Sequence, residues 1–229
     1  MTDPHGGQLT RVVAVRHGET AWNVDNRIQG QLDVPLNDTG RWQAERLAAA
    51  LVDEGITTIY SSDLQRARQT ADAVARRSGQ AVVDEPSLRE RGFGRFEGFT
   101  WTEIETRWPD ESERWRRRDP AFAPTGGETL ERFYQRSVDA ATRLAERHPG
   151  ETIALVAHGG VLDCLYRAAT RVGLQAPRSW QLGNAGINRL LYTPQGFTLV
   201  GWNDTGHLDA RPHDEFSDGN TLPAGQAAG

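Results

Sequence analysis

The order of its apolar runs is the feature that most constrains this chain. Four runs of strand length are separated by segments whose apolar residues recur at helical spacing. This β-α-β-α order predicts an α/β three-layer sandwich, with a mostly parallel sheet between two layers of helices. Two later runs, joined by TPQGF, predict an antiparallel hairpin at one edge. The expected strands are 11–15, 57–60, 81–84, 152–157, 187–192 and 198–202, and the expected helices are 44–51, 64–75, 130–144 and 161–172.

Composition narrows the class of protein. The chain has 229 residues, a length that suits one large α/β domain, which we place at residues 9–205. Residues 1–8 and 206–229 are expected to be flexible tails, the latter because it is rich in Gly, Pro, Asp and Ala. A net charge of −5 argues against nucleic acid as a partner. No apolar run approaches a membrane span, so no membrane partner is expected either.

The scarcity of cysteine and the lack of lysine exclude several kinds of chemistry. Cys164 is the single cysteine and is expected in the core of its helix. A lone cysteine and an N-terminus unlike a signal peptide lead us to expect a cytoplasmic protein. All 26 basic residues are arginine, because the sequence contains no lysine. Schiff-base chemistry and a Walker-type phosphate lysine are therefore excluded, and an anion must be held by Arg, His or backbone N–H groups.

Polar residues follow each expected parallel strand. Arg16 and His17 follow the first, and the second leads through Ser61–Ser62 to Arg66 in the first turn of a helix. Ser62 and Gln65 have the spacing of a capping box for that helix. Glu90 lies between Arg89 and Arg91 after the third, and His158 is followed by two glycines after the fourth. Ligands of open parallel sheets bind at the carboxyl ends of strands, so these residues predict a site for a dianion with a proton donor beside it.

Four ordered blocks carry a family resemblance. VRHGETAWN, SSDLQRARQTA, LRERGFGRFEG and LVAHGG resemble the histidine phosphatase superfamily, the phosphoglycerate mutase-like fold, over residues 10–203. The resemblance implies that His17 becomes phosphohistidine and that Glu90 exchanges protons with the leaving group and water. It also implies that Arg16, Arg66 and His158 bind phosphate, with Asn23, Gln29 and Gly159 as further phosphate or substrate ligands. No cofactor and no metal is expected, because no clustered carboxylates or paired histidines are present.

Phosphoryl transfer to His17 places physical requirements on the residues around it. His17 attacks phosphorus only when neutral, and neighbouring cations favour the neutral form. The cations would also neutralise the oxygens of the metaphosphate-like transition state. Glu90 must hold a proton near neutral pH, which the substrate's charge and partial burial would favour. Gly18, Gly159 and Gly160 are expected to let the backbone approach phosphate.

Three functions fit these residues. The RFEG ending favours the phosphatase branch: a metal-independent phosphomonoesterase acting on a small phosphorylated metabolite. A phosphoglycerate mutase would use the same catalytic residues. A catalytically silent phosphate-binding module is the third reading. The resemblance also implies a homodimer, and it implies that residues 99–127 form a lid over the pocket that sets substrate size.

Each candidate residue has a structural alternative. Arg16 and His17 could end a surface strand, and Arg66 could be a solvated helix residue, as is expected of Arg68. Glu90 could pair with Arg89 or Arg91. His158 could be a capping or core residue, Asn23 a turn residue and Ser61 the end of its strand. In the run Arg114–Arg118, Arg116 or Arg117 could hold a second anion of the substrate, or the run could be a solvated face.

Overall fold

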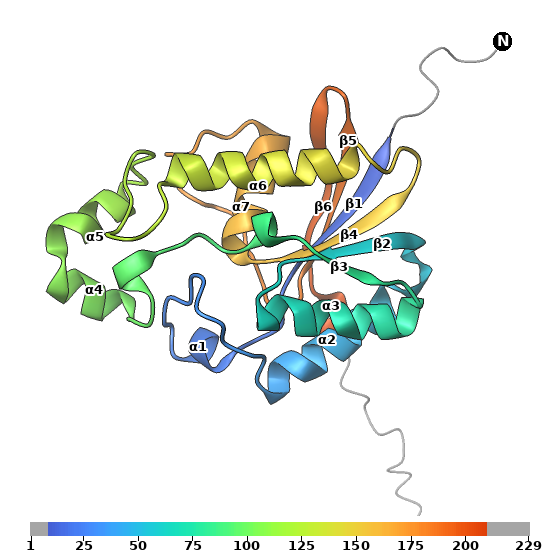
Figure 1. Ribbon diagram of the computed structural model, residues 1–229, viewed down its shortest axis with the longest axis horizontal. Helices are drawn as coiled ribbons and strands as arrows, with labels where there is room; N and C mark the ends of the chain where they lie inside the picture. The colour runs from blue at the N-terminus through green and yellow to red at the C-terminus, as the bar shows by residue number, and fades with distance from the viewer. Residues whose placement is uncertain (1–8, 210–229) are drawn as a thin grey trace, which may run out of the picture.

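The computed structural model describes residues 9–209, in which a six-stranded sheet lies between two layers of helices (Figure 1). The strand order is β3-β2-β4-β1-β5-β6, and β3, β2, β4 and β1 are parallel. β5 and β6 form the antiparallel hairpin at one edge, as predicted. The predicted α/β sandwich is therefore confirmed. The strands are β1 Thr10–Arg16, β2 Ile56–Ser61, β3 Val82–Asp84, β4 Thr152–Ala157, β5 Ile187–Thr193 and β6 Gly196–Asp204.

Side-chain alternation along the strands builds two separate cores. Val12 and Ala14 of β1 belong to one apolar cluster with the residues of α6 and α7. Val13 and Val15 face the other way and belong to a cluster with α2 and α3. Successive side chains of a strand point to opposite faces, so a fully apolar strand buries both. The covering helices are α2 Asp38–Ala50, α3 Gln65–Ser78, α6 Leu130–Ala145 and α7 Gly159–Thr170.

The lid segment contains two helices that the sequence patterns did not predict. α4 Trp101–Arg107 and α5 Pro109–Arg116 lie beside the sandwich, on the left in Figure 1. They enclose a third apolar cluster around Phe96, Ile104 and Phe122. Tryptophans and charged residues alternate too irregularly here to show a clear 3.6-residue period. The remaining short helices are α1 Ala21–Val24 and α8 Gly206–Asp209, with 3-10 turns η1 Val52–Glu54, η2 Pro86–Leu88 and η3 Gly94–Phe96.

Two local predictions were wrong. The expected capping box at Ser62 does not form, because α3 starts at Gln65 with Leu64 as its N-cap and no side-chain cap. The flexible C-terminal tail was expected to start at residue 206. Residues 206–209 instead form α8, and the carbonyl of His207 accepts a hydrogen bond from Arg46. The rest of that tail, and the expected tail at 1–8, lie outside the described residues. Within residues 9–209, no helix has both the length and the apolar character needed to cross a bilayer.

Candidate active site

Parallel pairing brings the predicted residues to one edge of the sheet. Arg16, at the end of β1, is opposite Ala157 of β4, so His17 and His158 follow paired positions. Their ring centroids lie 5.2 Å apart. Ser61 ends the neighbouring strand β2, opposite Val156 of β4. The prediction that these strand ends meet is confirmed.

His17 is held as a neutral base with one defined tautomer. Its Nδ1 lies 2.7 Å from the carbonyl oxygen of Gly18. A carbonyl can only accept, so Nδ1 carries the proton and Nε2 keeps its lone pair. Burial lowers the pKa of His17 well below 6.5, and the charges of Arg66 and Arg16 lower it further. The predicted effect of the cations is present, but burial is the larger cause.

Arg66 is a buried cation beside this histidine. Its Nη1 and Nη2 donate to the carbonyls of Leu32 at 2.8 Å and Gly30 at 2.7 Å. Burial lowers its pKa to about 10, so it stays charged at neutral pH. The loop that contains Gly30 and Leu32 therefore fixes the guanidinium, and the solvated alternative for Arg66 is wrong. Arg68, by contrast, is partly exposed and pairs with Asp72 and Asp84.

The half-buried Arg16 and the buried His158 complete the polar cluster. Arg16 donates through Nη1 to the carbonyl of Leu182, and burial lowers its pKa. His158 is fully buried, its Nε2 lies 2.8 Å from Ser62 Oγ, and burial lowers its pKa well below 6.5. Arg16 Nε, Arg66 Nε and His158 Nδ1 are buried without a hydrogen-bond partner in the described part of the chain. Buried polar atoms are normally paired, so this cluster is suited to an anion.

Glu90 forms an ion pair with neither Arg89 nor Arg91, which was the structural alternative to a catalytic role. Its Oε1 accepts from the backbone N–H of Arg91 at 2.8 Å, and its Oε2 accepts from that of Gly160 at 3.0 Å. The Arg91 guanidinium instead donates to the carbonyls of Glu128 and Phe122. The carboxylate is thus held by two backbone N–H groups, one from the residue that follows it and one from the first turn of α7.

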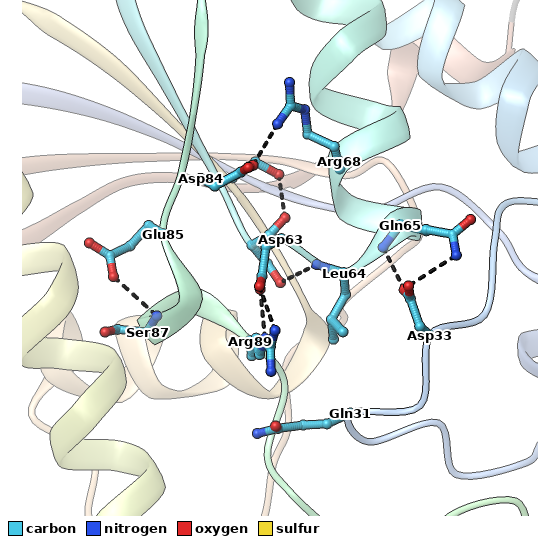
Figure 2. A network of polar contacts seen from close by, with 12 residues as sticks. Gln31, Asp33, Asp63, Leu64, Gln65, Arg68, Asp84, Glu85, Ser87 and Arg89 are labelled. Atoms are coloured by element: carbon cyan, nitrogen blue, oxygen red, sulfur yellow. Dashed lines mark hydrogen bonds and ion pairs between the residues drawn. The ribbon is translucent and has the colours of Figure 1, made fainter.

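A polar network fixes the segments that present Glu90 and Arg66 (Figure 2). Arg89 forms a two-pronged ion pair with Asp63, with Nε 2.6 Å from Oδ1, which ties the loop before Glu90 to the start of α3. Asp33 accepts from the backbone N–H of Gln65 at 2.7 Å and from its side chain at 2.9 Å. Gln65 is therefore engaged by Asp33 rather than by Ser62.

Packing within the protein favours glycine at two of the three positions where the backbone is expected to approach phosphate. A Cβ at Gly18 would lie 2.5 Å from the carbonyl oxygen of Gly40. A Cβ at Gly160 would overlap Glu90 Oε1 and lie 3.0 Å from the Phe133 ring. At Gly159 the nearest atom is Arg16 Nε at 3.5 Å, an ordinary contact. The expectation that the backbone at these three glycines approaches phosphate stays a prediction, and Gly159 remains a candidate ligand.

Asn23 and Gln29 occupy different positions relative to the site. Asn23 Oδ1 accepts from the backbone N–H of Thr20 at 3.0 Å in a capping box at α1, and from Asn184 Nδ2 at 3.3 Å. It also lines the main cavity. Gln29 is buried, its Oε1 has no partner among residues 9–209, and it does not line that cavity. The phosphate role implied for Gln29 stays a prediction.

Sequence reasoning missed Asn184 and the role of Ser62. Asn184 Nδ2 donates to the His17 carbonyl at 3.0 Å as well as to Asn23. It lies in a loop after α7 that has no recognisable pattern. Ser62 was placed after the second strand and given a capping role, but its hydroxyl contact with His158 was not predicted. Its position directly after the second strand was the available signal.

A cavity of about 1390 Å³ opens above the buried cluster. Arg16, Asn23, Glu90 and Gly159 lie in its lining, whereas His17, Arg66 and His158 are buried outside that lining. The predicted lid does line it, with aromatic walls from Trp101, Trp115 and Phe122 of that segment. In the part of the chain that is described, no group of three or more His, Cys, Asp or Glu residues could hold a metal ion.

The arginine run of the lid is mostly engaged by carboxylates. Arg117 is 75% exposed and pairs with Glu113. Arg116 lines the cavity, but its side chain is 54% exposed and its guanidinium pairs with both Glu105 and Glu113. The solvated-face interpretation therefore describes Arg117, and Arg116 is already neutralised by protein groups.

Comparison with known proteins agrees with this geometry. Residues 12–205 match the model of the histidine phosphatase superfamily (branch 1). The chain is 39% identical over 211 residues to Phosphoglycerate mutase-like protein 4 of Arabidopsis thaliana, covering 90% of each chain. It is 36% identical over 206 residues to the Metal-independent phosphoserine phosphatase of the same plant, covering 89% of this chain and 85% of the relative.

Solved structures agree in fold. The mycobacterial glucosyl-3-phosphoglycerate phosphatase in complex with VO3 superposes with a TM-score of 0.77 at 33% identity, covering 85% of this chain and 99% of that structure. The family model spans both histidines, Arg66 and Glu90, and the structure brings these residues into one cluster. This chain belongs to the histidine phosphatase superfamily, branch 1.

Proposed function

We propose that this chain is a metal-independent phosphoric monoester hydrolase for a small phosphorylated metabolite, with its catalytic domain at residues 9–205. One observation carries the proposal above the others. His17 has an unprotonated Nε2, because Gly18 accepts the Nδ1 proton, and the ring lies among buried cations. A neutral imidazole beside fixed positive charge is what attack on a phosphate dianion requires.

The first step transfers the phosphoryl group to His17. The lone pair of Nε2 forms a bond to phosphorus while the bond from phosphorus to the ester oxygen breaks. Glu90, in its protonated form, gives its proton to the departing alkoxide. Arg16 and Arg66 neutralise the charge that spreads over the phosphoryl oxygens, while the neutral His158 ring and the amide nitrogen of Asn23 are further hydrogen-bonding groups for them.

The second step regenerates the enzyme. Water attacks phosphorus, the bond between phosphorus and Nε2 breaks, and the water proton passes to the Glu90 carboxylate. Inorganic phosphate leaves and His17 is neutral again. The backbone N–H groups of Arg91 and Gly160 hold the Glu90 carboxylate at the cavity wall, so the same group is in place for both steps.

The relatives support this reaction. One carries the name of a phosphoserine phosphatase described as metal-independent, and a structural neighbour is a phosphatase solved with VO3. The name Phosphoglycerate mutase-like protein 4 favours a second function, an isomerase in which the phosphoryl group passes from His17 to another hydroxyl instead of to water. A silent phosphate-binding module is the remaining candidate, and the complete cluster of nucleophile, cations and proton donor argues against it.

The test is the release of inorganic phosphate from a panel of phosphorylated metabolites in the presence of a chelator. Hydrolysis that persists with the chelator supports the proposal, and loss of activity that Mg²⁺ restores would refute the metal-independent mechanism. With 3-phosphoglycerate, formation of 2-phosphoglycerate without phosphate release would identify a mutase. Phosphate binding without either product would identify the silent module. The homodimer stays a prediction that light scattering can check, as does the cytoplasmic location, which fractionation can check.

A further inference from the structure

The charges around the large cavity do not balance on one of its walls. Asp163 of α7 has only 8% of its side chain exposed and accepts from two guanidiniums. Arg118, which follows α5 within the lid, donates to its Oδ2 at 3.0 Å, and Arg167 donates to the same oxygen at 2.9 Å. Two cations thus share one carboxylate, which leaves this wall positively charged.

A third cation lies on the same wall. Arg178 lines the cavity with Arg118 and Asp163. Burial lowers the pKa of Arg118, and the charges of Arg167 and Arg178 lower it further. The charge of Arg178 also lowers the pKa of Arg16, so Arg178 lies within electrostatic reach of the phosphate cluster as well. Like charges gathered at one place disfavour each other unless an anion joins them.

Arg178 differs from the other arginines that line the cavity. Within residues 9–209 it takes part in no hydrogen bond or ion pair, whereas the others all have protein partners. Those partners are the Leu182 carbonyl for Arg16, Glu103 for Arg27, the Glu128 and Phe122 carbonyls for Arg91, Glu105 and Glu113 for Arg116, and Asp163 for Arg118.

The backbone of Arg118 supports the use of its side chain at this wall. Its φ of 52° places it in the left-handed region directly after α5. Glycine is favoured at such a helix end, because a Cβ is strained there. Arg118 nevertheless reaches Asp163 and the Leu174 carbonyl, which joins the lid to α7 beside Arg178.

We propose that Arg178, with Arg118 near it in the same cavity lining, binds a second anionic group on the leaving group of the substrate, a carboxylate or a second phosphate. This inference rests on the proposed phosphatase function and names its substrate class: phosphomonoesters with a second acidic group. The second-anion role thus falls to Arg178, in the lining segment 177–184. It does not fall to Arg116 or Arg117, because carboxylates of the lid already neutralise their charges. A charged hydrogen bond across this wall orients the leaving group toward Glu90.

The experiment compares matched substrates and matched variants. 3-Phosphoglycerate carries a carboxylate where glycerol 3-phosphate carries a hydroxymethyl group. In 1,3-propanediol bisphosphate the second anionic group is a phosphate. Phosphate release is measured for the wild type, Arg178→Gln and Arg117→Gln, with p-nitrophenyl phosphate as a general substrate. Arg117→Gln removes the same charge from an exposed residue that does not line the cavity.

We expect the wild type to prefer a doubly anionic substrate over glycerol 3-phosphate by about tenfold or more in kcat/KM, as a charge-assisted hydrogen bond allows. Arg178→Gln should reduce that preference to below about threefold, mainly through KM, while Arg117→Gln keeps it. Preference for 3-phosphoglycerate identifies a carboxylate, and preference for the bisphosphate identifies a phosphate.

Two outcomes overturn the inference while the phosphatase stands. One is hydrolysis of p-nitrophenyl phosphate with no wild-type preference for a second anion. The other is an Arg178→Gln variant that loses activity equally on all substrates, or that behaves like Arg117→Gln. If no substrate, including p-nitrophenyl phosphate, releases phosphate, the proposed function itself fails and this inference fails with it.

Discussion

Replacing Gly160 by alanine tests whether the position of Glu90 controls proton transfer to the leaving group. The new Cβ would overlap Glu90 Oε1 and lie 3.0 Å from the Phe133 ring. A carbon and an oxygen normally approach to about 3.3 Å at the closest, so the carboxylate must move by about 1 Å. Because the obstructing group is the end of a flexible side chain, the fold accommodates the change. Alanine also favours the helix that begins here by up to about 1 kcal/mol.

A displacement of about 1 Å costs about 10²-fold in rate when it affects a reacting group, or roughly 2.7 kcal/mol of barrier. We therefore expect kcat for an alkyl phosphate to fall about 100-fold. With p-nitrophenyl phosphate the loss should stay below about tenfold, because that leaving group needs little protonation.

The assay is steady-state phosphate release with both substrates, alongside thermal unfolding of each variant. Gly201→Ala is the matched control, because a Cβ there has nothing within 4 Å. Wild-type kcat for the alkyl phosphate in Gly160→Ala would refute the reasoning. Equal losses on both substrates would show that the substitution disturbs more than Glu90.

The other predictions concern the nucleophile, the acid and the buried histidines. His17→Ala should lose at least about 10³-fold in kcat, because no other group accepts the phosphoryl group, and substantial residual turnover in a phosphate-release assay would refute the nucleophile. Glu90→Gln should slow alkyl phosphates about 10²-fold or more and p-nitrophenyl phosphate far less; equal losses would remove Glu90 from the acid role. The pKa values of His17 and His158 are depressed in the folded state, so the unfolded chain binds more protons below pH 6.5. The free energy of unfolding is therefore unaffected by protonation of these two groups above pH 6.5. Below that pH it falls by up to about 2.7 kcal/mol for each pH unit, counting both histidines. Urea unfolding between pH 5 and 8 measures this slope, which His158→Gln should reduce.

Periodic patterns predicted the sandwich because its elements are stabilised by burial that repeats along the chain. β4 was predicted with its observed bounds, and the sheet edge was predicted from the residues that follow the strands. The lid helices were missed because α4 and α5 bury aromatic side chains in a small local cluster instead of against the sheet. The capping box at Ser62 failed because α3 begins only at Gln65, and a tertiary partner, Asp33, accepts from both the backbone and the side chain of Gln65.

The site divides in the same way. That Arg16, His17, Arg66 and His158 meet follows from the order of parallel strands, which the sequence patterns show. The role of Glu90 could be inferred from its family block, but its choice of backbone donors over Arg89 and Arg91 could not. That choice depends on Arg89 finding Asp63 and on Gly160 approaching Glu90 from 70 positions away.

The sequence by itself was enough to predict the order of the sheet strands and their covering helices, and which residues lie at the carboxyl ends of the strands. Its lack of lysine also excluded lysine chemistry. These features are local, or repeat with a fixed period, so they can be identified along one chain. Tertiary structure alone decided the neutral state of His17, the packing role of Gly160, and the isolation of Arg178 among paired arginines. Each of these depends on the neighbours that folding brings together, because burial and the nearest charge set the state of a polar group.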